Sequence, residues 1–352
     1  MKIMTVVGAR PQFVKAAVVS REMTNFNVEE KIIHTGQHYD QNMSDIFFEE
    51  MEIPKPTYSL GIGGSSHGDM TGRQLIEIEK ILLQDRPDYV LVYGDTNSTL
   101  AGALAASKLH IPVAHVEAGL RSFNKKMPEE LNRILTDQLS EKLFCPTDVA
   151  VKNLYAEGVS NSDNKVINVG DVMLDASLFY KKCAVSPSGL IADNEFILCT
   201  IHRAENTDNI DKLVSIVESL NIISNTYEVV FPVHPRTRSK IESLDIKINF
   251  TMLEPVSYFE MLWLLDNCRM VVTDSGGLQK EAFFFNKYCL TIRDETEWVE
   301  LVSNGVNVLT SANVNDITCK FFDLISIGEF KTNSKLLYGD GKAASKILGN
   351  LK

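Results

Sequence analysis

Short apolar runs rich in β-branched residues alternate along the chain with longer stretches of helical periodicity. This alternation predicts parallel strands that are covered by helices. In the first half the predicted strands are residues 3–7, 31–35, 89–93, 113–116 and 142–145. In the second half they are residues 196–201, 228–233, 248–253, 270–273 and 288–292. Amphipathic helices are predicted between them, for example over residues 99–108, 212–223 and 258–267.

The length of 352 residues exceeds what one hydrophobic core usually supports and suits two α/β domains. The pattern breaks over residues 166–175, and a polar stretch at 186–189 precedes the next strand. We predict two Rossmann-like, doubly wound domains, residues 1–168 and 169–339, with a C-terminal helix of about residues 340–352 packing back on the first. The ligand is expected between them, at the carboxyl ends of the strands.

Composition narrows the class of protein. A hydrophobic content of 44% and a charged content of 23% are typical of soluble globular proteins, and the net charge of −11 argues against a nucleic-acid or anionic-membrane partner. The apolar segment after Met1 is too short for a signal peptide, and no apolar run reaches the ~18 residues of a membrane span. The six cysteines are scattered without a CxxC pair, so we expect buried thiols in a cytoplasmic protein, with neither disulfides nor structural zinc.

The first candidate motif, Gly8-Ala-Arg-Pro-Gln-Phe-Val-Lys15, follows the opening strand directly. Gly8 permits a tight turn, and Pro11 suits the first turn of a helix. Arg10 and Lys15 would then lie near a helix N-terminus, where backbone N–H groups favour an anion. The alternative is an ordinary strand–helix turn with two solvated cations.

The second motif, residues 271–281, reads as a strand, a loop with Ser275, Gly276 and Gly277, and a helix carrying Glu281. Glycines allow close approach to a phosphate, and the helix N-terminus offers free N–H groups. The motif is neither a Walker A loop nor GxGxxG, so ATP and NAD are not indicated. Glu281 could accept hydrogen bonds from a ribose. The alternative is a glycine-rich turn with a surface glutamate.

Ionisable residues follow several predicted strands. Asp95 and Glu117 stand at strand exits in the first half, Glu129 and Glu130 open a helix after Pro128, and His202 follows the first strand of the second half. Carboxylates gathered at one sheet edge can divide acid and base roles. Taken singly, each has a structural alternative as a cap or a core residue. The histidines, including His34, His38 and His234, lack metal-ligand spacing, so no metal site is expected.

The stretches GARPQFVK, TGQHYD, YGDTNSTLAGALAA, HVEAGLR, PEELNR, HRAEN, EPVSYFEM and TDSGGLQKEA occur in this order along nearly the whole chain. In order and spacing the sequence resembles the non-hydrolysing UDP-N-acetylglucosamine 2-epimerase family. The resemblance implies the two-domain fold of GT-B glycosyltransferases with the active site in the interdomain cleft, a homodimer, and no cofactor or essential metal. It also implies a role in the synthesis of surface-polysaccharide precursors.

The resemblance implies a definite chemistry. UDP leaves C1 as the C2 proton is removed, and the resulting 2-acetamidoglycal recombines with UDP after protonation of its other face. By position, Asp95, Glu117, Glu129 and His202 match the catalytic residues. The residues that match the UDP-binding set are Arg10, Lys15, Arg203, His234, Glu254, Ser275, Gly276, Gly277 and Glu281.

The sequence departs from the best-known members in two segments. The link between Glu117 and Glu129 is shorter, and Gln37 is followed by His38, Tyr39 and Asp40. An acidic Asp40 beside a second UDP-sugar would repel its diphosphate, so we predict no strong substrate activation. Residues 297–300 resemble relatives that act on modified UDP-sugars, such as diacetamido-uronates or 6-deoxy sugars. Arg121, Lys125 and Lys126 could meet a uronate carboxylate, or could form a solvated basic loop.

Three other functions remain open at this point. A hydrolysing epimerase would perform the same elimination and let water reach the glycal. A GT-B glycosyltransferase would need an acceptor groove and would not need the three carboxylates. A catalytically silent sugar-nucleotide sensor would not need Asp95, Glu117, Glu129 and His202 together.

Overall fold

The computed structural model describes residues 1–37, 48, 51–160, 165–190, 195–244, 246–332 and 336–351, and for Arg10 only the backbone. The chain divides into two compact units: residues Met1–Ala176 with Leu336–Lys352, and residues Ser177–Lys335. Each unit is built on a parallel sheet, seven-stranded in the first unit and six-stranded in the second. Helix α7 (Val172–Tyr180) crosses the division.

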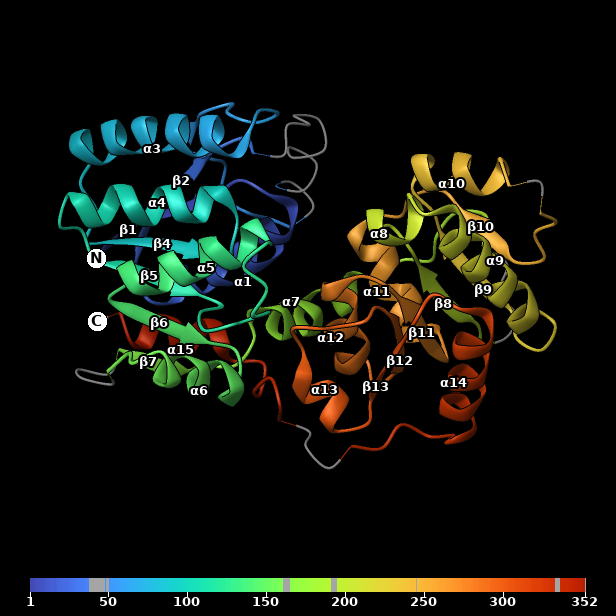
Figure 1. Ribbon diagram of the computed structural model, residues 1–352. Coiled ribbons are helices and arrows are strands. Elements are labelled where there is room, and N and C mark those ends of the chain that lie inside the picture. Colours follow the sequence, from blue (N-terminus) through green and yellow to red (C-terminus); the bar gives the residue numbers. More distant parts are fainter. Residues whose placement is uncertain are drawn as a thin grey trace. The chain divides into compact units, whose positions relative to one another are not determined.

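The first sheet has the strand order β3-β2-β1-β4-β5-β6-β7. The strands are β1 Lys2–Val7, β2 Glu29–His34, β3 Tyr58–Ser59, β4 Tyr89–Tyr93, β5 Val113–Val116, β6 Lys142–Cys145 and β7 Val166–Asn168. The helices are α1 Arg10–Asn25, α3 His67–Gln84, α4 Asn97–Lys108, α5 Pro128–Leu139, α6 Asp148–Ala156 and α15 Ala343–Gly349. Helices α3 and α4 lie side by side over the sheet (Figure 1), and α1 packs against β1, β2, β4 and α15.

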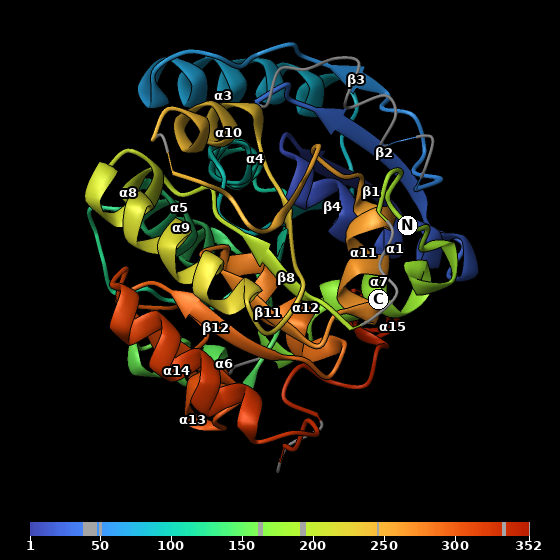
Figure 2. The same ribbon diagram turned by 90° about the vertical axis from the view of Figure 1, so that its right-hand side faces the viewer.

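The second sheet has the order β10-β9-β8-β11-β12-β13. Its strands are β8 Ile197–Thr200, β9 Val229–Pro232, β10 Thr251–Leu253, β11 Met270–Thr273, β12 Tyr288–Ile292 and β13 Asn307–Thr310. Its helices are α8 Ala204–Thr207, α9 Ile210–Ser224, α10 Pro235–Glu242, α11 Tyr258–Asn267, α12 Gly276–Phe284, α13 Val299–Ser303 and α14 Val314–Ser326, with a 3-10 turn at Lys181–Cys183. Helices α9 and α14 cover one face, and α11 and α12 the other (Figure 2).

Local sequence accounts for these elements. In α3 the buried residues Met70, Gln74, Ile78 and Leu82 recur every fourth position, which gives the helix one inward face. The strands β4 and β5 are almost wholly buried and, apart from His115, apolar, as expected for parallel strands covered on both faces. Pro11 lies in the first turn of α1, as predicted. None of the helices within the described ranges combines the length and the apolar character of a membrane span.

The predicted doubly wound parallel sheets are confirmed. Strands β4, β5, β6, β11 and β12 have the predicted bounds, while β10 is three residues long instead of spanning 248–253. Three short strands were not predicted: β3, β7 and β13. Residues 166–175, where the break was expected, contain β7 and the start of α7. Of the six cysteines, Cys319 is exposed and Cys183 only partly buried, so the prediction of buried thiols is wrong for these two.

Strand order fixes where a ligand site can form. In each sheet the winding direction reverses once, between β1 and β4 in the first unit and between β8 and β11 in the second. Ligands of open α/β sheets bind outside the carboxyl ends of the strands at this reversal. The segments that leave these strands contain Gly8, Asp95, His202 and Ser275, which are all predicted site residues or lie in predicted motifs.

Candidate active site

Two carboxylates and one ammonium group meet at the carboxyl ends of β4 and β5. The Lys15 ammonium, from the second turn of α1, forms an ion pair with the Glu117 carboxylate, and both side chains are about nine-tenths buried. Gly94 lies against this pair, because a Cβ atom there would be 3.2 Å from Glu117 Oε2 and 3.6 Å from Lys15 Nζ. The structure therefore brings Lys15 and Glu117, predicted from separate motifs, to the segment that carries Asp95.

Asp95 has its own cationic partner, which the sequence analysis did not assign. The guanidinium of Arg133, on α5, pairs with the Asp95 carboxylate. Burial raises the pKa of Asp95; Arg133 opposes this rise and the neighbouring Glu117 carboxylate adds to it. A carboxyl group with a raised pKa holds a proton closer to neutral pH, which suits it to acid–base catalysis.

The backbone at Glu117 is in an unusual conformation. Its φ angle of 73° lies in the left-handed region, which costs a non-glycine residue about 1–2 kcal/mol. The amides of Glu117 and Ala118 both donate to the carbonyl oxygen of Phe144, each at 3.0 Å. Strained backbone held by surrounding structure is characteristic of functional sites. The side chain of this residue is the one that pairs with Lys15.

The two glutamates that open α5 have different environments. Glu130 is buried, and its carboxylate accepts hydrogen bonds of 2.9 Å from the amides of Ser122 and Phe123 and pairs with Arg133 at 3.0 Å. It therefore holds the loop before α5. Glu129, the predicted catalytic residue, is exposed. Its catalytic role stays a prediction.

Arg121 is not part of a solvated basic loop, and it is not available to a substrate. Its guanidinium is buried, donates to Glu157 through Nε and Nη2 at 2.7 Å each, and pairs with Asp137 at 2.8 Å. In the sequence, Arg121 lies close to Lys125 and Lys126, and this proximity suggested that all three belong to one solvated basic loop. Those two lysines are exposed.

The residues of the Gly8 motif make close local contacts. Gly8 is needed for close packing, since a Cβ atom there would lie 2.1 Å from Thr35 Oγ1 and 2.3 Å from Ser98 Oγ. The side chain of Gln12 accepts hydrogen bonds from the amides of Gly8 at 2.8 Å and Ala9 at 3.1 Å. Two amides at this helix N-terminus thus already have a partner. The Arg10 side chain and residues His38 to Asp40 lie outside the described residues, so the predictions made for them are untested.

The second unit has an acidic residue at its centre that the sequence analysis missed. Asp274, directly after β11, is fully buried and accepts hydrogen bonds from the amides of His202 and Arg203 and from Asn206 Nδ2 at 3.0–3.2 Å. Its carboxylate is also 3.2 Å from His202 Nδ1. Burial opposes ionisation, but these donors hold the pKa of Asp274 below its usual range. The sequence signal that could have identified Asp274 is its position between a buried strand and the Ser275-Gly-Gly loop.

Ser275 to Gly277 form the start of α12. The Ser275 hydroxyl accepts from the Leu278 amide at 3.4 Å and so caps the helix. Around Gly276 lie three charged groups: Glu297 Oε1, Arg293 Nη1 and Arg203 Nη2 are 3.6, 3.9 and 4.0 Å from the position of a Cβ atom. The two guanidinium groups outnumber the one carboxylate, so this group of side chains carries a net positive charge beside the N-terminus of the helix.

Arg293 and Glu297 form an ion pair at 2.9 Å, and Arg293 holds the pKa of Glu297 below its usual value despite burial. The indole of Trp298 completes this corner. Its Nε1 donates to the Gly276 carbonyl oxygen at 2.8 Å, and the Lys280 ammonium lies 4.1 Å from the centre of its ring. Glu297 and Trp298 therefore lie against the same loop as Ser275 to Gly277.

The remaining predicted UDP-binding residues are spread over the second unit. Glu281 is buried on α12, and its charge contributes to the raised pKa of Tyr258, whose main cause is burial. His234 caps α10 by accepting from the Arg236 amide at 3.3 Å. Glu254 is exposed and pairs with Arg238 at 3.2 Å. These local contacts do not test a role in nucleotide binding.

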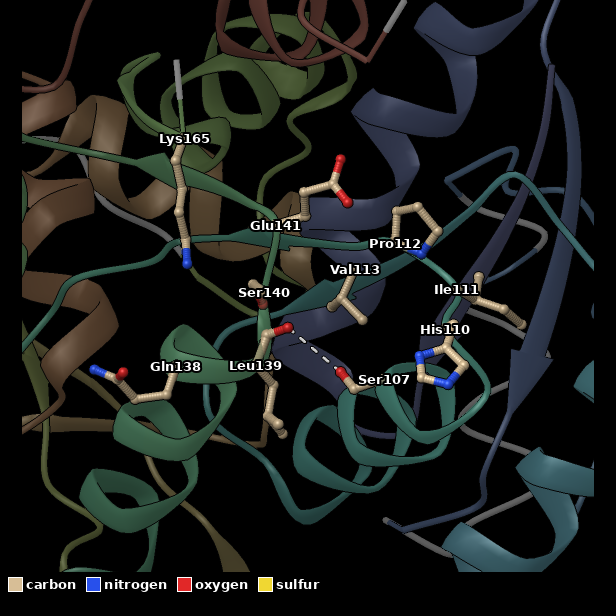
Figure 3. Close-up of a pocket in the computed structure, with 10 residues that line it drawn as sticks. All are labelled: Ser107, His110, Ile111, Pro112, Val113, Gln138, Leu139, Ser140, Glu141 and Lys165. Atoms are coloured by element: carbon tan, nitrogen blue, oxygen red, sulfur yellow. Dashed lines mark hydrogen bonds between the residues drawn. The ribbon is translucent and has the colours of Figure 1, made fainter. Parts of the chain in front are cut away.

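A surface pocket of about 360 Å³ lies at the opposite edge of the first sheet (Figure 3). It is bounded by the ends of α4 and α5 and by the starts of β5 and β6, with Ser107, His110, Gln138, Glu141 and Lys165 in its wall. It contains none of the predicted site residues. The candidate chemistry is therefore at the carboxyl ends of the strands and not in this pocket.

The fold and these charged clusters define a class: proteins with two doubly wound parallel sheets and charged side chains at the strand exits. A solved glycosyltransferase, VinC, in complex with DTDP, shares the fold with a TM-score of 0.56 at 15% identity, covering 100% of this chain and 95% of that one. This likeness shows a GT-B-like fold alone.

The sequence model of the UDP-N-acetylglucosamine 2-epimerase family matches residues 21–352. The UDP-2,3-diacetamido-2,3-dideoxy-D-glucuronate 2-epimerase of Pseudomonas aeruginosa is 57% identical over 99% of this chain and 98% of its own length. The crystal structure of Methanocaldococcus jannaschii UDP-GlcNAc 2-epimerase in complex with UDP-GlcNAc and UDP is 41% identical, with a TM-score of 0.89 over 100% of this chain and 99% of that one. The chain belongs to the UDP-N-acetylglucosamine 2-epimerase family and is a UDP-sugar 2-epimerase, an isomerase.

Proposed function

We propose that the substrate is UDP-2,3-diacetamido-2,3-dideoxy-D-glucuronate and that the enzyme inverts its C2 centre. The observation that carries this proposal is the full-length likeness to the Pseudomonas aeruginosa enzyme of that name, at a higher identity than to the archaeal UDP-GlcNAc 2-epimerase. The segment at Trp298, which resembles relatives acting on modified sugars, supports it. UDP-GlcNAc itself is the second candidate, because it is the sugar of the archaeal relative.

Residues of the first unit are proposed to carry out the reaction at the sugar. One carboxylate takes the proton from C2 while the C1–O bond breaks and UDP leaves with the bonding electrons, giving a C1=C2 double bond. UDP then returns to C1 as a proton is delivered to the opposite face of C2. Glu117, as the ion-paired carboxylate beside Lys15, suits the base, and Asp95, with its raised pKa, suits the acid. Glu129 is proposed as a third acid–base residue.

The leaving UDP is proposed to bind to the second unit. Arg203 and the N-terminus of α12, beside the ion pair of Arg293 with Glu297, concentrate positive charge in a chain whose net charge is −11. His202 is proposed to assist departure of the diphosphate, oriented by Asp274. Arg10 and Lys15 are proposed as further cations for the diphosphate. The reaction is redox-neutral, and the proposal includes no metal or nicotinamide cofactor.

The test is to incubate the enzyme with each UDP-sugar in deuterated water containing a chelator, and to analyse the products by NMR and mass spectrometry. The proposal expects epimerised UDP-diacetamido-glucuronate carrying deuterium at C2, formed at a higher kcat/KM than any product from UDP-GlcNAc. Free sugar with UDP would show a hydrolysing enzyme. A faster reaction with UDP-GlcNAc would contradict the substrate assignment.

The catalytic assignment is tested with Glu117→Gln and Asp95→Asn. Each variant should lose about 10²–10⁴ in kcat, the usual contribution of a positioned acid or base, while UDP binding in calorimetry stays close to wild type. Near-normal turnover of either variant would remove that residue from the mechanism.

We also propose a homodimer, which light scattering on the eluting peak of a sizing column would test.

A further inference from the structure

His115 connects the exits of two neighbouring strands. It lies on β5, two residues before Glu117, and its side chain is fully buried. Its Nε2 is 2.7 Å from the carbonyl oxygen of Gly94, the residue before Asp95. Its Nδ1 is 2.7 Å from Oδ1 of Asp137 on α5. The ring of His115 therefore contacts the backbone next to Asp95, one candidate catalytic carboxylate. His115 itself lies in the segment that leads to Glu117, the other candidate.

Asp137 extends this connection to the turn after Glu117. Its second oxygen, Oδ2, accepts from the Gly119 amide at 3.1 Å and from Arg121 Nη1 at 2.8 Å. Gly119 has a φ of 80° and Glu117 a φ of 73°, so this turn has a left-handed backbone at two positions. The Asp137 carboxylate thus fixes the far end of the turn whose first residue is Glu117.

The contacts of the ring determine its protons. The Gly94 carbonyl oxygen can only accept a hydrogen bond, so Nε2 carries a hydrogen. The Asp137 carboxylate pairs with Arg121 and therefore accepts hydrogen bonds. Nδ1 of His115, which faces this carboxylate, therefore carries a hydrogen as well. A neutral imidazole has only one N–H and would leave one of these two acceptors facing a lone pair.

The surroundings balance the resulting charge. Arg121 and a doubly protonated His115 contribute two positive charges, and Asp137 and Glu157 two negative ones. The Cys145 thiol, also near Asp137, adds none, because burial and the Asp137 charge raise its pKa. Buried charges are tolerated when they are paired and hydrogen-bonded in this way.

We infer that His115 is a positioning residue: as an imidazolium that donates from both ring nitrogens, it fixes Gly94 and the Asp137-held turn, and so sets the relative placement of Asp95 and Glu117. The inference rests on the roles proposed for those two carboxylates. It assigns His115 no contact with substrate. Its effect is on the geometry of proton transfer and not on the binding of UDP.

The kinetic test compares His115→Asn with His110→Asn, the same substitution at an exposed histidine of the first unit. Misplacing catalytic groups by about 1 Å costs on the order of 100-fold in rate, so we expect kcat of His115→Asn to fall about 10- to 100-fold with KM within about twofold. Ile78→Val, a core change in α3, controls for lost stability. A kcat unchanged from wild type, or a loss matched by an equally destabilised Ile78→Val, would overturn the inference.

A spectroscopic test does not depend on turnover. In protein labelled with 15N-histidine, the His115 signals are assigned by their absence in His115→Asn, and both ring nitrogens should carry protons at pH 7. If that variant does not fold, Asp137→Asn serves instead: its amide can donate to Nδ1, so the ring should become neutral and lose the Nδ1 proton. An unprotonated ring nitrogen in wild type refutes the inference even in an active epimerase, whereas an active Asp95→Asn or Glu117→Gln refutes the proposed roles without changing this spectrum.

Discussion

Asp175 couples the stability of the first unit to pH in the direction opposite to most carboxylates. Its side chain, on α7, accepts hydrogen bonds from the amides of Ala343 at 3.1 Å and Ala344 at 2.9 Å, at the start of α15. Burial raises its pKa from 3.8 to about 6, although the two amides oppose the rise. The native state therefore holds this proton more tightly than the unfolded chain does between pH 3.8 and 6.

The sign and size follow from linkage. Stability falls as pH rises wherever the native state binds more protons, so Asp175 costs stability progressively from pH 4 upward, and the loss is complete just above pH 6. The full shift corresponds to about 3 kcal/mol, and the part between pH 4.5 and 6.5 to about 2 kcal/mol. Asp175→Asn resembles the protonated carboxyl and has no charge to lose.

The assay is urea unfolding of wild type and Asp175→Asn at several pH values between 4.5 and 6.5. Far-UV circular dichroism follows both units, whereas fluorescence from the two tryptophans, Trp263 and Trp298, reports on the second unit only. Other carboxylates titrate in both proteins, so the difference between their unfolding free energies isolates Asp175. As pH rises, the unfolding free energy of wild type should fall by about 2 kcal/mol relative to that of Asp175→Asn. Parallel curves, or a shift of opposite sign, would refute the reasoning.

Three further outcomes are expected. Gly8→Ala should destabilise the first unit by about 2–4 kcal/mol in the same unfolding assay, because the new Cβ must separate the hydrogen-bonded hydroxyls of Thr35 and Ser98; a loss below about 0.5 kcal/mol would contradict the close packing. Asp274→Asn should destabilise the second unit by about 2–4 kcal/mol, visible in tryptophan fluorescence, because an amide group cannot accept from every donor around it; unchanged fluorescence unfolding would show that those donors find other partners. Lys15→Ala should weaken binding of UDP more than that of uridine in calorimetry, and equal losses would mean that Lys15 serves only its ion pair with Glu117.

The sequence by itself determined the elements that build the sheets. Parallel strands covered on both faces are largely apolar runs, which is why β4, β5 and β11 could be bounded from their residues alone. The two-residue β3 and the partly polar β13 carry too little of this pattern, and only pairing with a neighbour makes them strands. The order of the motifs along the chain was enough to indicate the family, because it does not depend on how the side chains are placed.

Only the tertiary structure decided which charges meet. Lys15 and Glu117 are 102 residues apart and pair because their strand exits lie at one sheet edge. Glu129 and Glu130 are equivalent in sequence, but successive helical residues point about 100° apart, so one is exposed and the other buried against Arg133. The sequence near Arg121 allowed a solvated cation, but in the structure its guanidinium is buried and pairs with Asp137 and Glu157. Hydrophobic periodicity is a local property that a sequence displays, whereas the partner of a buried charge is set by chain segments that only folding brings together.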